Sequence, residues 1–314
     1  MIEPLPSKGI PTDPASAAGT SAAAPSDASV ASTPEWLSSL IARAREADGQ
    51  PPFSDQSLVD LRTGARELVA LEHNAAALVS LGEAEFVVDP AARGRGLGTA
   101  MLEGLLAGSP GELLIWAHGD HPAARALAHS HSLEAVRELL HLRLDLAAQP
   151  ATDPIQPATD SAAAHLVTKS VVDVDTFRVG EDEDEWLALN AKAFAHHPEQ
   201  GKVTRADLDE LFGEEWFSAD DFLLAREGGR IVGYCWLKVD AAGGEFYVVG
   251  IDPDAQGKGL GRALAEAGLE RMRGRDIPLA HLYVEADNVA AVRLYRSLGF
   301  EDDSIDIQYR ALAR

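Results

Sequence analysis

The chain has 314 residues, of which 46% are apolar and 25% charged, and its formal net charge is −23. This length suits about two folded domains, and the apolar content excludes a wholly disordered chain. The negative charge excludes a general nucleic-acid-binding surface, and the single cysteine, Cys235, excludes internal disulfides and cysteine-cluster metal sites.

Composition divides the chain into four segments. Residues 1–34 are rich in Ala, Ser and Pro and predict a disordered tail, because they offer little apolar surface to bury. Residues 147–170 have a similar composition and predict a linker. Between and after them lie two candidate domains, 35–146 and 171–314.

Helical and strand patterns alternate within both candidate domains. In the first, they predict a helix over 36–47, a strand over 85–88 and a helix over 99–106. In the second, a glycine in mid-strand, Gly250, predicts a β-bulge. The elements expected there are helices over 184–194, from Thr204 and over 262–272, strands over 222–226, 230–239, 245–251, 280–285 and 305–310, and a helix between Asn288 and Gly299.

A glycine-rich turn occurs twice, each time between a strand and a helix. The first copy reads DPAARGRGLG over 89–98 and the second reads DPDAQGKGLG over 252–261. Two such turns in the same context indicate an internal duplication. Glycine lets backbone N–H groups approach an anion closely, and the following helix N-terminus adds favourable potential, which suits a pyrophosphate.

The spacing in these turns fits neither of two common nucleotide motifs. A dinucleotide-binding turn would need a small residue at Leu264, and a P-loop would not place Gly259 after Lys258. The pattern Gln/Arg-x-x-Gly-x-Gly instead resembles that of the GCN5-related N-acetyltransferases (GNAT), whose acetyl donor is acetyl-CoA. The resemblance implies an α+β fold of two tandem GNAT-type domains, each a mixed, mostly antiparallel sheet flanked by helices.

Longer strings resemble one branch of that family, the mycothiol synthases of actinobacteria. They are AFAHHPEQG over 193–201, EWF over 215–217, LYVEADNVAAVRLY over 282–295 and, in the first half, WAHG over 116–119. The resemblance implies an enzyme that acetylates the cysteine amine of cysteinyl-glucosaminyl-inositol, a pseudo-disaccharide thiol, to give mycothiol.

The resemblance also implies roles for individual residues. Glu245 would be the general base, acting through water, and Tyr295 the acid that protonates the leaving thiolate. In the second half, the residues expected to bind acetyl-CoA are Val249, Gly250, Ile251, Gln256, Gly257, Lys258, Gly259, Leu260, Gly261, Arg262, Asn288, Val289, Ala290, Ala291, Val292 and Arg293. The residues expected to bind the acceptor are Asp55, Glu199, Lys238, Glu245 and Tyr283.

The first half is expected to bind CoA without catalysing. Its CoA contacts would be Phe86, Val87, Val88, Gly94, Arg95, Gly96, Leu97, Gly98 and Thr99. Counting from the two glycine-rich turns places Gly82 opposite Glu245, with two carboxylates, Glu83 and Glu85, close by in the sequence. Aligning the two final helices places Ala128 opposite Tyr295, so this half would lack both catalytic groups.

Two other functions remain open at this point: an acetyltransferase for another amine, such as a protein N-terminus or an aminoglycoside, and a CoA-binding sensor without turnover. We expect no metal, no nucleic-acid partner and a monomer. Because no apolar run approaches 18 residues and the first residues lack a basic, apolar leader, we expect a cytoplasmic protein without a membrane-spanning segment.

Overall fold

The computed structural model describes residues 33–109, 111–147, 173–195, 200–240 and 243–312. Nearly all of the predicted linker and of the predicted tail lies outside these residues. The described residues form two compact units, an N-terminal unit of 33–139 with 304–312 and a C-terminal unit of 140–303. The units therefore do not follow the sequence boundaries at 146 and 171, because 304–312 belongs to the N-terminal unit and 140–147 to the C-terminal one.

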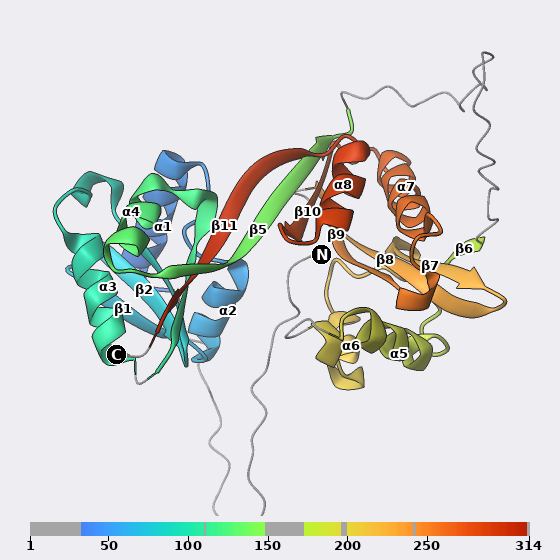
Figure 1. The fold of residues 1–314 in the computed structure, drawn as a ribbon, viewed down its shortest axis with the longest axis horizontal. Coiled ribbons are helices and arrows are strands. Elements are labelled where there is room, and N and C mark those ends of the chain that lie inside the picture. Colours follow the sequence, from blue (N-terminus) through green and yellow to red (C-terminus); the bar gives the residue numbers. More distant parts are fainter. Residues whose placement is uncertain (1–32, 110, 148–172, 196–199, 241–242, 313–314) are drawn as a thin grey trace, which may run out of the picture. The chain divides into compact units, whose positions relative to one another are not determined.

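The N-terminal unit is built on a mixed sheet with the strand order β1-β2-β3-β4-β11 (Figure 1). Neighbouring strands are antiparallel except β3 and β4, which are parallel. Its elements are α1 (Glu35–Asp48), α2 (Asp55–Thr63), β1 (Glu67–Leu71), β2 (Ala75–Ser80), β3 (Glu83–Val88), α3 (Leu97–Gly108), β4 (Leu113–Ala117) and α4 (Pro122–Ser130), with short 3₁₀ turns at Pro90–Ala92 and His118–Asp120.

Alternate side chains of this sheet bury opposite faces, as a period of two requires. On β2, Ala75 and Ala77 pack in one core with Met101 of α3, whereas Ala76 and Leu78 pack in another core with residues of α1. Helices thus cover both faces of the sheet.

The C-terminal unit has a second mixed sheet, with the order β5-β10-β9-β8-β7-β6. Here β9 and β10 are the parallel pair, and β6 to β9 are antiparallel neighbours. Its elements are β5 (Glu134–Asp145, shared with the N-terminal unit), β6 (Asp173–Thr176), α5 (Glu183–Ala193), α6 (Arg205–Leu211), β7 (Phe222–Glu227), β8 (Arg230–Asp240), β9 (Gly243–Ile251), α7 (Leu260–Arg273), β10 (Leu279–Glu285) and α8 (Val289–Ser297), with 3₁₀ turns at Gln200–Lys202, Ala219–Asp221 and Pro253–Ala255.

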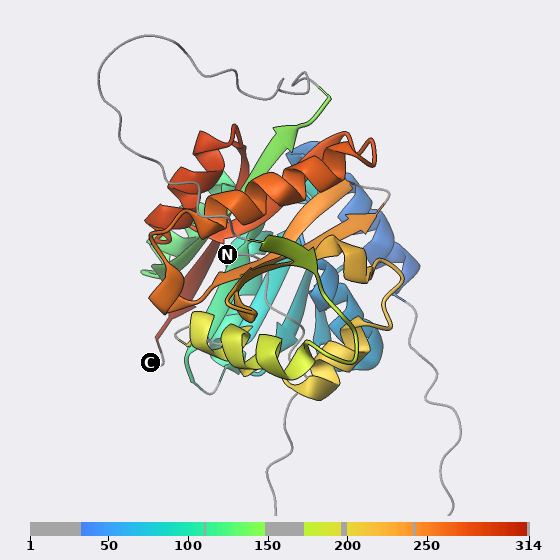
Figure 2. The ribbon, with the colours of Figure 1, turned by 90° about the vertical axis from the view of Figure 1, so that its right-hand side faces the viewer.

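The predicted class of α+β with mixed, mostly antiparallel sheets is confirmed in both units. In the C-terminal unit, α5 and α7 lie on opposite sides of the strands (Figure 2). An aromatic cluster that includes Trp186 and Trp236 fills the α5 side. Helix α6 begins after Thr204 as predicted, and Thr204 and Asp207 form a capping box at its start.

Strand β11 (Glu301–Ala311) comes from the far end of the sequence but completes the N-terminal sheet. It pairs antiparallel with β4 through Tyr309↔Ile115 and Ile307↔Ala117. Ala311 is buried in the same core as Met101 of α3. In the other direction, residues 140–145 of β5 belong to the C-terminal unit, so each unit contains a strand segment from the opposite part of the chain.

Candidate active site

The two glycine-rich turns have nearly the same backbone conformation. Arg93 and Gln256, the first residues of the two motifs, have φ/ψ of −63°/159° and −64°/161°. Of the glycines that follow, Gly94 and Gly257 have φ of 73° and 76°, and both Gly96 and Gly259 have φ of 83°. These positive φ values are the ones that glycine adopts without strain. The predicted duplication is thus reproduced at the level of single dihedral angles.

Both turns leave the start of a helix open to an anion. Gly96 and Gly259 are the N-cap residues of α3 and α7, and neither helix has a side-chain cap on its first N–H groups. Uncapped N–H groups at a helix start, next to glycines with positive φ, are suited to bind a phosphate. The glycines and the helix starts therefore fit the diphosphate of CoA.

Strands β9 and β10 separate immediately after the predicted base. They pair only at Gly244↔Ala280 and Glu245↔His281, which leaves β9 unpaired on this side from residue 246 onward. The opening places the backbone of Val249–Ile251 beside a gap between two parallel strands. The bulge predicted at Gly250 is wrong: the register shift lies between Val248 and Phe246. Gly250 instead lacks a side chain because a Cβ would lie 2.5 Å from the ring of Tyr234.

Three of the predicted acceptor residues lie together beside this opening. Glu245 is buried at 6% exposure, and Lys238 on β8 is its register partner. The Lys238 ammonium lies 5.7 Å from the centre of the Trp216 ring, a cation–π contact. Tyr283 on β10 stacks on His141 at a centroid distance of 4.5 Å. Glu199 lies outside the described residues.

The predicted acid lies on the other face of the sheet. Tyr295 of α8 is 2% exposed, and its ring lies 6.1 Å from that of Phe246. Glu245 precedes Phe246 on β9, so the two side chains point to opposite faces. Burial raises the pKa of the Tyr295 phenol, which therefore keeps its proton at neutral pH. The predicted base and the predicted acid thus lie on opposite faces of the C-terminal sheet.

The residues expected along the CoA arm lie at the start of α8 and on α7. Asn288 caps α8 by accepting a hydrogen bond from Ala291 N at 3.2 Å, and Arg293 is exposed. Arg262, near the start of α7, donates to Ser297 Oγ at 2.5 Å and to Glu266 at 3.1 Å. A bound diphosphate would have to compete with these two contacts for Arg262.

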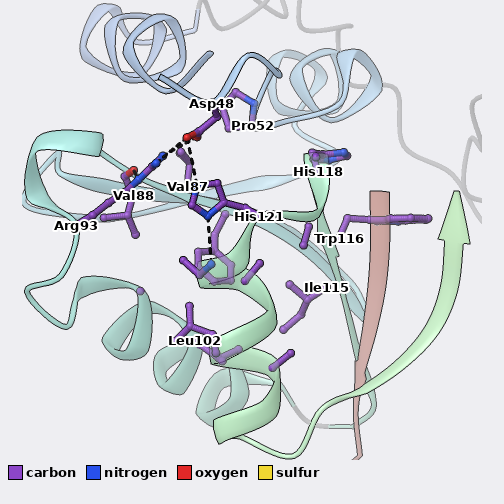
Figure 3. A pocket seen from close by; sticks show the side chains of 18 of the residues that line it. Asp48, Pro52, Val87, Val88, Arg93, Leu102, Ile115, Trp116, His118 and His121 are labelled. Atoms are coloured by element: carbon purple, nitrogen blue, oxygen red, sulfur yellow. Dashed lines mark hydrogen bonds and ion pairs between the residues drawn. The ribbon is translucent and has the colours of Figure 1, made fainter. Parts of the chain in front are cut away.

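The N-terminal unit encloses a cavity of about 300 Å³ at the corresponding opening between β3 and β4 (Figure 3). Those strands pair as far as Glu85↔Trp116 and then separate. Apolar side chains of β3, β4 and α3 line the cavity, together with Ala128 of α4 and the glycine-rich turn. Eight of the nine CoA contacts expected in this half line the cavity, and the ninth, Arg95, is exposed. The eight are Phe86, Val87, Val88, Gly94, Gly96, Leu97, Gly98 and Thr99.

An acidic side chain occupies the polar end of this cavity. Asp48, the last residue of α1, accepts two hydrogen bonds of 2.6 Å from the Arg93 guanidinium (Figure 3). Its carboxylate also lies 3.4 Å from Nε2 of His121. The hydrogen bonds from Arg93 lower the pKa of Asp48, which keeps it ionised. The turn of the N-terminal unit therefore has an arginine paired with a carboxylate where its C-terminal counterpart has Gln256.

The structure corrects one alignment between the two halves. Glu245 pairs with His281, which lies seven residues before Asn288, the N-cap of α8. In the N-terminal sheet, Leu114 lies seven residues before His121, the N-cap of α4, and pairs with Glu83. Counting along the sequence indicated Gly82, because β9 contains one extra residue at its register shift.

The carboxylate of Glu83 is already bound by other side chains. It accepts hydrogen bonds from Arg66 at 2.6 Å, Trp116 at 3.0 Å and Gln308 at 3.3 Å. The placement of Ala128 opposite Tyr295 is supported, since Leu127 packs on Gly98 as Leu294 packs on Gly261.

A buried charged cluster in the N-terminal unit had no signal in the sequence pattern. The imidazole of His118 lies between Asp306 of β11 and Glu85 of β3. Glu85 accepts hydrogen bonds from Ser54 N at 2.9 Å and from Ser57 Oγ at 2.6 Å. These contacts fix the start of α2, whose first residue is the exposed Asp55.

Two further features bear on the range of possible chemistry. Cys235 is fully buried, and burial raises the pKa of its thiol, so it is unsuited to be a nucleophile. Among the described residues, no group of three or more His, Cys, Asp or Glu side chains could hold a metal ion. Over the same part of the chain, every helix is too short or too polar to cross a bilayer.

Comparison with known proteins agrees with this geometry. The family description "Acetyltransferase (GNAT) family" matches residues 186–300. The mycothiol acetyltransferase of Clavibacter sepedonicus is 43% identical over 302 residues, covering 91% of this chain and 96% of that protein. The protein of the same name from Streptomyces coelicolor is 43% identical over 297 residues, covering 88% and 92%.

Solved structures share the fold at low sequence identity. A GCN5-related N-acetyltransferase from Sphaerobacter thermophilus has a TM-score of 0.61 and 23% identity, covering 89% of this chain and 92% of that one. A tandem GNAT protein from the clavulanic acid biosynthesis pathway has a TM-score of 0.59 and 16% identity, covering 89% and 94%.

Proposed function

This chain belongs to the mycothiol acetyltransferases of the GNAT family, and from that membership we propose which of its residues carry each step of the reaction. The enzyme uses acetyl-CoA to acetylate an amine and so produces mycothiol. The proposed acceptor is the cysteine amine of cysteinyl-glucosaminyl-inositol. The observation that carries the assignment is the position of Glu245, in the last residue pair before β9 and β10 separate.

Glu245 is the proposed general base. The amine must lose a proton before it attacks the thioester, and a carboxylate at the edge of the opening can accept it through a water molecule. Lys238 is the register partner of Glu245, so the two side chains lie on the same face of the sheet. Lys238, Tyr283 and Trp216 would contact the acceptor, with Glu199 and Asp55 proposed as further contacts.

Backbone groups of the unpaired part of β9 would polarise the thioester. In Val249–Ile251, N–H groups facing the gap can donate to a carbonyl oxygen and to the pantetheine chain, and fixed donors of this kind stabilise a developing oxyanion. The turn at Gln256–Gly261 and the start of α7 would hold the diphosphate.

Tyr295 is the proposed acid. Its protonated phenol can donate to the thiolate as the carbon–sulfur bond breaks. The raised pKa of the phenol does not prevent this, because the same dry surroundings raise the proton affinity of the thiolate. The acceptor starts as an ammonium group and loses two protons on becoming an amide. One of them is balanced by the proton that the CoA thiolate gains.

We also propose that the N-terminal unit binds CoA without turnover. Its cavity has the expected place and apolar lining. Ala128 stands where the C-terminal unit has Tyr295, the proposed acid. Glu83 stands where that unit has Glu245, the proposed base, and its carboxylate accepts hydrogen bonds from three side chains.

The test is an assay of the purified full chain with acetyl-CoA and a panel of amines, in which free CoA is measured. Release of CoA confined to cysteinyl-glucosaminyl-inositol is expected. Equal turnover with simple peptides or aminoglycosides would overturn the proposed acceptor.

A further inference from the structure

A row of polar side chains crosses the C-terminal sheet at the predicted base. Lys238 of β8, Glu245 of β9 and His281 of β10 are register partners in turn, so their side chains share one face. Tyr283 follows on the same face of β10, two residues after His281. None of the roles proposed above uses His281.

The row continues from β10 to β5 and β11. Nδ1 of His281 lies 3.3 Å from Nε2 of His141, within hydrogen-bond reach. The other ring nitrogen of His141, Nδ1, lies 3.1 Å from the carboxylate of Asp303, and Arg143 holds that carboxylate at 3.2 Å. Stacking on Tyr283 fixes the plane of the His141 ring. Asp303 and His141 thus form an ordered pair behind His281.

The end of this row is open to solvent. The side chains of His141 and Asp303 are 17% and 24% exposed, whereas Glu245 is 6% exposed. A row of titratable groups therefore runs from the buried Glu245, through its register partner His281, to His141 and Asp303 at the solvent-exposed end.

The charge state of His281 suits proton transfer. The charged and titratable groups that face it are Glu245, Lys238 and Asp240 from β8 and β9, and His141 and Asp303 from β5 and β11. Burial, His141 and Lys238 lower the pKa of His281 to about 4, while Asp240 and Asp303 act in the opposite direction. A neutral imidazole can accept a proton on one nitrogen and release one from the other.

We propose that His281 and His141 form a proton relay that returns Glu245 to its ionised state by passing the amine proton to solvent beside Asp303. The proposal rests on the proposed role of Glu245. Each turnover converts an ammonium and a thioester into an amide, a thiol and one proton in excess. That proton moves from the amine to Glu245, then to His281, and a proton leaves His141. No group is oxidised or reduced.

The two histidines act through Glu245 and are therefore positioning residues. The test compares the full-length wild type with His281→Gln, a variant that keeps a hydrogen-bonding side chain but cannot relay a proton. His129→Gln, on the exposed side of α4, is the matched control. The rate is measured at pH 7 in dilute and concentrated small buffers, together with the melting temperature and the KM for acetyl-CoA.

A relay predicts a kcat loss of about tenfold in dilute buffer, less than the loss of a general base itself. Concentrated buffer should restore most of the rate, because small buffer molecules can then accept the proton. The melting temperature and the KM for acetyl-CoA should stay at wild-type values. In the double variant with Glu245→Gln, the loss should equal that of Glu245→Gln alone, because the two residues act in one chain.

Two results would overturn the relay: a kcat unchanged in dilute buffer, or a loss that buffer does not relieve. Should His281→Gln fail to fold, His141→Gln carries the same test, because it breaks the next link and leaves His281 in place. The proposed function is judged separately, by turnover of the wild type with its acceptor and by the single variant Glu245→Gln.

Discussion

The imidazole of His118 is held by the carboxylate of Asp306, with Nδ1 2.8 Å from Oδ2. Asp306 also accepts a hydrogen bond from Gly119 N at 2.9 Å. Burial alone would lower the pKa of His118, but Asp306 and Glu85 outweigh it and raise the pKa to about 10. A buried imidazolium thus fastens β11 to the end of β4.

This pair predicts a pH-dependent stability. The pKa of His118 is raised to about 10 in the folded protein. Its contribution to the free energy of unfolding is therefore complete below the ordinary pKa of 6.5 and is lost as the pH rises through 10. Asp306→Asn should lower the free energy of unfolding by about 1.5–3 kcal/mol at pH 6, the range for a hydrogen bond to a charged group. Denaturant unfolding at pH 6 and pH 10 checks this. Asp302→Asn, an exposed neighbour on the same strand, is the control. An equal loss at both pH values would contradict the prediction.

Replacing the proposed base should slow the reaction without unfolding the enzyme. Glu245→Gln is expected to lower kcat by about 10²- to 10⁴-fold. Raising the pH should recover part of the rate, because more of the amine is then already neutral. Glu270→Gln, on the exposed side of α7, should have no effect. Steady-state rates from pH 6.5 to 9 test this, and an unchanged kcat would exclude Glu245 as the base.

Two buried tyrosines allow a matched test of the proposed acid. Tyr295→Phe should lower kcat by less than Glu245→Gln does, because a thiolate leaves fairly well unaided, and CoA affinity should be retained. Tyr234 donates to Asn190 Oδ1 at 2.6 Å within the core, so Tyr234→Phe should cost about 0.5–1.5 kcal/mol of stability and leave kcat unchanged. Melting curves and initial rates are compared for both variants. A Tyr295→Phe variant that loses only stability would make the residue structural.

The charge at the mouth of the N-terminal cavity should weaken CoA binding there. Asp48→Asn removes a carboxylate beside the glycine-rich turn and frees Arg93 for the diphosphate. The weaker of two acetyl-CoA sites is expected to tighten about three- to tenfold, in line with about 1 kcal/mol between partly exposed charges. Titration calorimetry on the full chain measures this, with Glu46→Gln as the exposed control on the same helix. An unchanged affinity would show that Asp48 does not oppose the ligand.

The exchange of strands predicts that the N-terminal half cannot be isolated by cutting at the linker. A fragment of residues 35–146 lacks β11 and exposes the edge of β4, which normally pairs through Ile115↔Tyr309. It should aggregate, and a synthetic peptide of residues 301–312 should keep it soluble and raise its melting temperature. A fragment equally soluble and stable without the peptide would refute this.

Local signals in the sequence predicted much of the fold and of the site. The glycine-rich turns, the Asn288 cap and the Thr204 capping box depend on residues close together in the chain, and all are present. The proposed role of Glu245 followed from family resemblance, and the pairing of β9 with β10 ends at that residue.

Features that depend on distant partners could not be predicted. No local pattern distinguishes a strand that pairs with β4, almost 200 residues earlier, from one that pairs within its own half. The bulge at Gly250 was predicted wrongly, because glycine is needed there to make room for the ring of Tyr234 on the neighbouring strand. The extra residue in β9 shifted the alignment of Glu245 from Glu83 to Gly82, since a sequence count cannot detect a bulge.

The position of β11 in the N-terminal sheet also governs the order in which the chain can fold during synthesis. The ribosome makes β1 to β4 first, but their sheet stays incomplete until residues 140–303 have followed. At usual rates of elongation this delay is roughly 10–30 s. Throughout it, the β4 edge and the apolar surface that Ala311 later covers remain exposed to other nascent chains. The N-terminal unit is therefore synthesised first but completed last. We expect chaperones to compete with other nascent chains for its exposed surface during translation.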